Sequence, residues 1–207
     1  MAYLKMQDVL EELLMHNMRI FSINDAVRIM EKSRAYVSKQ LSKNKKVLRI
    51  ERGKYYIQNN NGIDMYEIAS NIAFPSYVSM FSAFQYYSIT EQSVIRYSVI
   101  TIKRHRPIEI MGNVIEFITM HPSRFFGYAK MGNSYVATPE KAIIDSLYTG
   151  YPSISYVEEA FSAAIRDKLI DKKRLIKTAN LMGSKTVNMK LRKLFKENGL
   201  DVKDLGA

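Results

Sequence analysis

The stretch that decides the fold is "SRAYVSKQLSKNKKVLRIERGKYYI", residues 33–57. Its first half is typical of a short helix, in which Val37 and Leu41 stand one turn apart and face inward. The opposite side then carries Ala35, Tyr36, Ser38, Lys39, Ser42 and Lys43. This helix contains no Asp or Glu, although an ordinary solvated helix mixes charges of both signs. A lysine-rich exposed face is also compatible with plain solvation, so the neighbouring segments must decide.

The second half of the stretch predicts a β-hairpin. Leu48 and Ile50 lie on one side of an extended run, the chain turns near Arg52 and Gly53, and it returns through residues 55–57. Upstream, residues 4–14 carry a helical apolar stripe, and a Ser22–Asp25 capping signal starts a second short helix. Ser33 is expected to cap the third helix. Three short helices followed by a hairpin predict a winged helix-turn-helix over residues 1–60.

The second helix of such a motif lies in the DNA major groove, and the hairpin reaches the neighbouring backbone. Carboxylates at that surface would repel phosphate, and none is present on the helix. We therefore expect DNA contacts from Arg34, Tyr36, Ser38, Lys39, Ser42, Lys43, Arg52 and Lys54, with Ser38 near the edge of the face. Winged helices also serve as protein-interaction modules, so that alternative stays open.

The turn-prone "NNNG" at residues 59–62 marks the predicted boundary with a second unit, residues 61–207. Residues 63–73 and 77–89 are predicted as buried helices separated by Pro75. Strands are predicted at "YSVITI", "IEIM", "VIEFITM" and "YVAT", followed by a helix at "TPEKAIIDSLY". After Pro152 the chain is predicted to be helical, with breaks near Asp171 and Gly183. The expected fold class is α/β (α+β), with a mixed α/β domain and a helical C-terminal part.

The formal net charge of +11 suits a polyanionic partner, and its distribution is uneven. Residues 1–57 hold 12 basic and 6 acidic side chains, and residues 166–196 hold 11 and 2. The second block, together with "IKRHRP" at residues 102–107, is a candidate for a second basic surface. Its members would be Lys103, Arg104, Arg106, Lys172, Lys173, Arg174, Lys177, Lys190, Arg192 and Lys193. A solvated loop and solvated amphipathic helices explain the same charges equally well.

Catalytic patterns are weak. Cysteine is absent and the three histidines lie far apart, so we expect no metal and no cofactor. "GSKT" at residues 183–186 is predicted to be a turn between helices, and "SRFFGY" at residues 123–128 is predicted to fill a core. Glu140 and Asp145, five residues apart, are interpreted as a charge at a helix N-terminus and a surface or packing residue. We therefore expect no enzyme activity; a metal-dependent nuclease is the alternative.

Targeting and membrane signals are also weak. Asp8, Glu11 and Glu12 interrupt the start of the chain, where a secretory signal would be apolar. The most apolar region, residues 63–89, is broken by polar residues and by Pro75, so it lacks the length of a membrane span. A cytoplasmic protein without membrane contact is expected.

The order of segments resembles the AbiEi family of antitoxins and transcriptional regulators. The resemblance rests on "RGKYYI", "PSYVSMFSAFQYYSITEQ", "TIKRHRP", "RFFGY" and "VATPEKAIIDSLY", and it spans nearly the whole chain. It implies a repressor that binds repeats in the promoter of its own operon. It also implies counteraction, direct or indirect, of a nucleotidyltransferase-like toxin by the part after residue 60. Some relatives act only as regulators, so the antitoxin role stays open.

Overall fold

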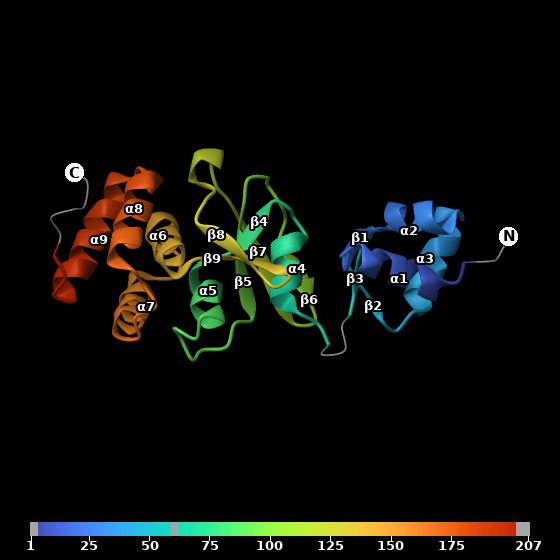
Figure 1. The fold of residues 1–207 in the computed structure, drawn as a ribbon, viewed down its shortest axis with the longest axis horizontal. Coiled ribbons are helices and arrows are strands. Elements are labelled where there is room, and N and C mark those ends of the chain that lie inside the picture. The colour runs from blue at the N-terminus through green and yellow to red at the C-terminus, as the bar shows by residue number, and fades with distance from the viewer. Residues whose placement is uncertain (1–3, 59–61, 202–207) are drawn as a thin grey trace. The chain divides into compact units, whose positions relative to one another are not determined.

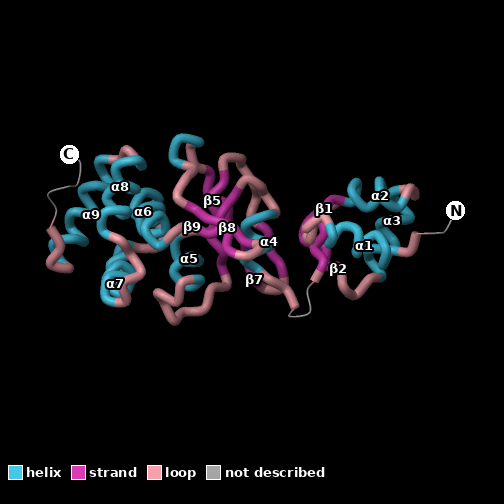
Figure 2. Tube along the Cα trace, viewed as in Figure 1, coloured by secondary structure: helices cyan, strands magenta, loops and turns pink. Residues whose placement is uncertain are grey.

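The computed structural model describes residues 4–58 and 62–201 (Figures 1 and 2). Within these residues the chain forms nine α-helices, one short 3-10 helix and nine strands in two sheets. The mixed α/β class predicted from the sequence is therefore confirmed. Contacts between Cα atoms divide the chain into two compact units, Met1–Ile68 and Ala69–Ala207. Residues 59–61 of the predicted boundary lie outside the described residues.

The first unit begins with three short helices. They are α1 (Met6–Met15), α2 (Ile23–Met30) and α3 (Arg34–Lys43). Ser22 Oγ accepts a hydrogen bond from the Asp25 amide, and the Asp25 carboxylate accepts one from the Ser22 amide, so the predicted capping box is present. Ser33 Oγ accepts from the Tyr36 amide at the start of α3. Both helix starts therefore follow from local sequence.

A three-stranded antiparallel sheet completes the first unit. Its strands are β1 (Ile20–Ser22), β2 (Val47–Glu51) and β3 (Lys54–Ile57), in the order β1-β3-β2. The predicted hairpin is confirmed as β2 and β3, with Gly53 in the turn at a φ of +80°, which favours glycine. Three residues are too few for β1 to show a strand pattern in the sequence. Phe21 stacks on Tyr55, and both belong to the core that includes Val37 and Leu41.

The second unit contains a six-stranded mixed sheet in the order β6-β7-β5-β4-β9-β8. The strands are β4 (Ser76–Val78), β5 (Arg96–Thr101), β6 (Ile108–Ile110), β7 (Asn113–Thr119), β8 (Tyr128–Met131) and β9 (Ser134–Ala137). The four predicted strands correspond to β5, β6, β7 and β9. Strand β4 pairs antiparallel with β5 and parallel with β9, so it occupies the middle of the sheet.

The prediction of a helix over residues 77–89 is wrong at its start. Tyr77 and Val78 belong to β4, and helix α5 (Met80–Tyr86) begins after them. All three residues of β4 are buried, because neighbouring strands and helices cover them. A short apolar run that is buried on both faces looks the same in sequence whether it is a strand or a helix. The preceding helix is confirmed, with narrower limits, as α4 (Met65–Asn71).

Helices form the C-terminal part of this unit, as predicted. They are α6 (Pro139–Thr149), α7 (Ile154–Arg166), α8 (Lys172–Met182) and α9 (Lys185–Glu197). Helix α6 packs against α5, α7, α8 and α9, and it is the central helix of the group in Figure 1. Gly183 ends α8 and Ser184 caps α9, so the predicted turn in "GSKT" is confirmed for Gly183 and Ser184, whereas Lys185 and Thr186 already belong to α9. The buried core of the second unit runs from the sheet through α6 into these helices.

Candidate nucleic-acid interface

Helix α3 presents one continuous polar face to solvent. Val37 and Leu41 are fully buried, so the rest of the helix is fixed in orientation around them. The exposed residues of the predicted contact set on this helix are Arg34, Tyr36, Lys39, Ser42 and Lys43; Ser38 is half-buried. Ser42 Oγ donates to the Lys39 carbonyl, and neither Lys39 nor Lys43 forms an ion pair in the described part of the chain. The face is therefore cationic and carries no carboxylate.

A pocket of about 480 Å³ lies between this helix and the β2–β3 hairpin. Its polar lining comes from Arg34, Ser38, Arg49 and Arg52, and its apolar lining includes Ile23 and Tyr55. Arg34 and Ser38 stand one turn apart on the edge of α3 that faces the hairpin. The structure thus brings three predicted residues together with Arg49, which the sequence interpretation missed.

Arg49 reaches the pocket because of the register of the small sheet. It pairs with Tyr55 across the hairpin, and Tyr55 pairs in turn with Phe21 on β1. Paired residues share a face of the sheet, and this face carries the core residues Phe21 and Tyr55. The exposed Arg49 side chain therefore emerges on the side of the sheet that α3 covers. The period-2 pattern of β2 could have indicated this, had the hairpin register been known.

Asn24, which the sequence interpretation also missed, holds Arg34 in place. Asn24 Oδ1 accepts a hydrogen bond from Arg34 Nη1 at 2.9 Å. The same guanidinium group lies close to the hairpin turn, since a Cβ atom added to Gly53 would be 3.5 Å from Arg34 Nη2. A neutral amide orients a guanidinium without cancelling its charge, so Arg34 remains a full cation.

The two predicted residues of the hairpin differ in availability. Arg52 is exposed and makes no hydrogen bond or ion pair within residues 4–58 and 62–201. Lys54 is half-buried, and its Nζ lies 2.8 Å from Glu51 Oε1. An ammonium group that already has a carboxylate partner gains less from a phosphate than an unpaired one. We therefore consider Arg52 a better candidate than Lys54 for contacting a phosphate.

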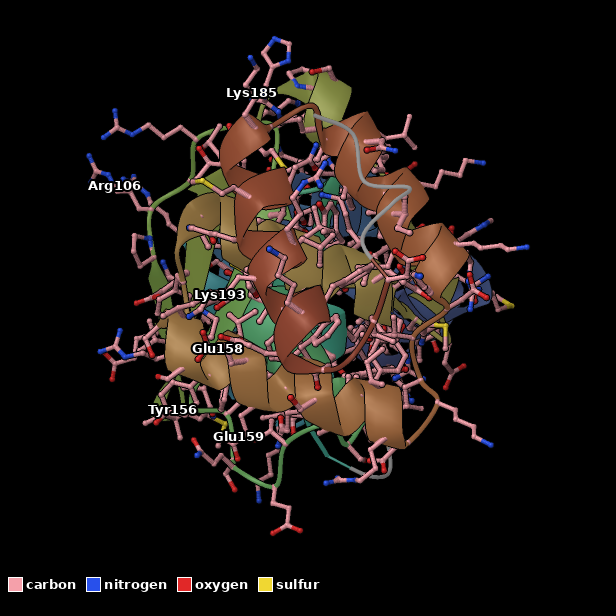
Figure 3. The ribbon with its side chains drawn as sticks, turned by 90° about the vertical axis from the view of Figure 1, so that its left-hand side faces the viewer. Arg106, Tyr156, Glu158, Glu159, Lys185 and Lys193 are labelled. Carbon is pink, nitrogen blue, oxygen red and sulfur yellow. The ribbon has the colours of Figure 1, made fainter. Side chains whose placement is uncertain are left out.

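The candidate second basic surface divides into a loop and two helices. Lys103, Arg104 and Arg106 are exposed in the loop between β5 and β6, where the His105 ring packs against Phe117 at 4.4 Å. Figure 3 shows the Arg106 side chain extending away from the ribbon. These three cations are accessible to solvent. This is compatible both with the predicted second basic surface and with a solvated loop.

Many of the predicted cationic side chains on α8 and α9 already have interaction partners within the protein. Arg174 pairs with Glu140 at 3.3 Å, and Lys193 pairs with Glu158 and Glu197. Figure 3 shows Lys193 and Glu158 side by side. Lys190 Nζ donates to the Leu147 carbonyl, Lys172 lies over the Phe195 ring, and Arg192 also has a partner. Lys173 and Lys177 are exposed and unpaired in the described part of the chain. The helices therefore offer fewer cations than their composition implies.

A buried polar cluster in the second unit was not predicted. Lys141 and Asp145 are fully buried on α6 and form an ion pair. Asp145 Oδ2 also accepts hydrogen bonds from Ser79 Oγ at 2.7 Å and from Tyr77 Oη at 3.1 Å. Burial lowers the pKa of Lys141 and raises the pKa of Asp145, and the attraction between the two charges opposes both shifts. The carboxylate is enclosed by protein donors, so we interpret the cluster as structural.

Three other predictions for this unit have clear outcomes. Glu140, predicted as a helix N-terminal charge, lies in the first turn of α6 but is 2% exposed, and it accepts from the Asp171 amide. Asp145, five residues later, is a packing residue rather than a surface residue. The prediction that the "SRFFGY" aromatics fill a core is only partly confirmed, because they are half-buried and Phe125 and Tyr128 pack against the core from outside. Gly127 is needed there, because its φ is +73° and a Cβ atom would lie 3.0 Å from the Lys141 side chain.

Within residues 4–58 and 62–201, no group of three or more His, Asp and Glu side chains is arranged to hold a metal ion. None of the described helices combines the length and the apolar composition needed to cross a membrane. No family model matches the chain, and no curated protein matches it either.

Proposed function

We propose that the protein is a sequence-specific DNA-binding transcriptional repressor. In this proposal the first unit is a winged helix-turn-helix, with α3 as the recognition helix and the β2–β3 hairpin as the wing. The order of elements supports this proposal, because three helices precede the β2–β3 hairpin. Strand β1, which lies between α1 and α2 in the chain, pairs with β3 of this hairpin.

The observation that carries the proposal is the uncompensated positive charge of α3 and the hairpin. Arg34, Lys39, Lys43, Arg49 and Arg52 are all exposed, and none has a carboxylate partner in the described part of the chain. Phosphate contacts by Lys and Arg supply most of the affinity of DNA-binding proteins, and side chains on the groove-facing helix supply specificity. The exposed Tyr36, 44% accessible, adds an aromatic group to this face.

The test is binding of the full chain to the DNA upstream of its own gene. Fluorescence anisotropy should show binding to this duplex at least about 10³-fold tighter than binding to a scrambled duplex of equal length. Affinity should fall steeply with salt, with a slope of about −0.9 for each phosphate contacted. Equal affinities for the two duplexes would reject sequence-specific repression and favour a protein-interaction module.

The resemblance to AbiEi regulators extends the proposal to autoregulation and to a partner toxin. We infer that the second unit carries the antitoxin role, if the neighbouring gene encodes a nucleotidyltransferase-like protein. Cells that express this neighbouring protein should stop growing, and co-expression of the full chain should restore growth. A variant of the chain with Lys39 and Lys43 replaced by alanine should still restore growth. Loss of rescue in this variant would tie neutralisation to DNA binding instead.

A further inference from the structure

The pocket between α3 and the hairpin differs from other cationic sites of this protein in its balance of charge. Its lining includes three guanidinium groups, from Arg34, Arg49 and Arg52, and no carboxylate. By contrast, Arg96, which lies outside the pocket, pairs with Glu116 at 2.6 Å.

The carboxylates nearest in sequence to the pocket residues are already engaged. The carboxylate of Glu51 pairs with Lys54, and that of Asp25 accepts hydrogen bonds from the Ser22 amide and hydroxyl. Arg34 is held by the neutral Asn24 side chain, and Arg49 Nε donates to the Glu51 carbonyl at 3.4 Å. The described residues that line the pocket therefore supply positive charge without a carboxylate, so an anion can bind there.

The shape of the pocket adds a second requirement. A volume of about 480 Å³ exceeds what a single inorganic anion fills, and Ile23 and Tyr55 line part of it with apolar surface. Planar guanidinium groups match phosphate oxygens in pairs, and Ser38 can donate one further hydrogen bond. A phosphate joined to a sugar satisfies both the charged and the apolar lining.

We propose that this pocket binds a sugar-linked phosphate, with Arg49 as a principal phosphate ligand. The proposal rests on the proposed function, in which the occupant is one phosphate of the DNA backbone with its deoxyribose. Arg34 and Arg52 then act as backbone ligands from the two sides of the pocket, and base contacts fall to the outward residues Tyr36 and Lys39. A free nucleotide offers the same chemistry and is the other source to be distinguished.

The first arm of the experiment locates a single phosphate. Full-length protein and its Arg49→Ala variant are titrated against a set of promoter duplexes, each with one phosphate replaced by an uncharged methylphosphonate. Arg49→Ala should weaken binding to the unmodified duplex by about tenfold or more. On the duplex that lacks the partner phosphate, the same substitution should cause no further loss. Arg49→Lys, which keeps the charge but not the paired donors, should lose part of the affinity.

The second arm tests the free ligand, with thymidine 3′,5′-bisphosphate and inorganic phosphate as probes in calorimetry. Arg28→Ala is the matched control, because Arg28 is an exposed arginine of the same unit whose side chain is 82% accessible and outside the pocket. Arg49 is itself exposed, and circular dichroism of each variant verifies that the fold is retained.

Four outcomes separate the pocket from the proposed function. Coupling between Arg49 and one phosphate supports a DNA occupant. Arg49-dependent binding of the bisphosphate without specific DNA binding supports the pocket and rejects the repressor. Specific DNA binding that Arg49→Ala does not change, or changes equally on every modified duplex, overturns the pocket and leaves the repressor standing. Absence of both DNA and nucleotide binding overturns both.

Discussion

The buried ion pair of α6 gives the sharpest stability prediction, through the substitution Lys141→Met. Methionine keeps the apolar stem of the side chain but removes the ammonium group that faces Asp145. The carboxylate then stays fully buried with only two neutral donors, Ser79 Oγ and Tyr77 Oη. Breaking a buried pair by removing one partner costs about 3–5 kcal/mol. That is a large part of the roughly 5–15 kcal/mol that stabilises a typical domain.

The cost should also depend on pH, and the sign follows from Asp145. Without the ammonium group, burial raises the pKa of this carboxyl further above its ordinary value of 3.8. A group whose pKa is raised in the folded state contributes stability below its unfolded pKa and loses it as pH rises through the folded pKa. The variant should therefore lose about 1.4 kcal/mol for each pH unit between those two values.

Urea unfolding at a series of pH values, followed by circular dichroism, measures both effects. Lys130→Met is the matched control, because Lys130 is exposed on β8 and its loss should stay within about 0.5 kcal/mol. The double variant Lys141→Met, Asp145→Asn restores a neutral acceptor for the two hydroxyl groups and should recover most of the loss. A cost below about 1 kcal/mol, or a cost that does not change with pH, would refute the assignment of a buried charged pair.

Three further predictions concern the first unit. Lys39→Ala combined with Lys43→Ala should weaken promoter binding by about tenfold or more with little change in stability, and an unchanged gel-shift affinity would place the groove contact elsewhere. Arg52→Ala should lower the salt slope by about 0.9, whereas Lys54→Ala should lower it less because its ammonium group is already paired; equal changes would contradict that ranking. Burial raises the pKa of Tyr56 to about 12, so the protein should lose about 1.4 kcal/mol of stability between pH 9 and pH 11. The Tyr56→Phe variant should not show this loss. Urea titrations at these pH values test the prediction, and identical pH profiles for the two proteins would disprove it.

Sequence reasoning predicted the elements whose signals are local. Ser22 and Ser33 each accept the predicted capping hydrogen bond, because a cap depends on residues within one turn. It failed for β1 and β4, which are three residues each and exist because partners far along the chain pair with them. It also missed β8, although β8 is joined to β9 by the two-residue turn Gly132–Asn133, which is a local hairpin signal. Arg49 was missed although its hairpin was predicted, because its place in the pocket depends on the exact register with Tyr55.

Sequence reasoning is limited in the same way for charge. A polyanion binds to the charges that remain unpaired at the surface, and the composition of a segment does not show which these are. Residues 166–196 have the larger excess of cations, yet Arg174 and Lys193 are neutralised by Glu140 and Glu158, carboxylates of α6 and α7 that no i,i+4 rule connects to them. The smaller excess in residues 1–57 leaves more cations of α3 and the hairpin unpaired, because α3 lacks carboxylates and Glu51 in the hairpin is paired with Lys54. In the described part of the chain, Arg34, Lys39, Lys43, Arg49 and Arg52 therefore have no carboxylate partner, although their segment has the smaller excess of cations. This is the physical reason to propose DNA binding for the first unit rather than for the C-terminal helices.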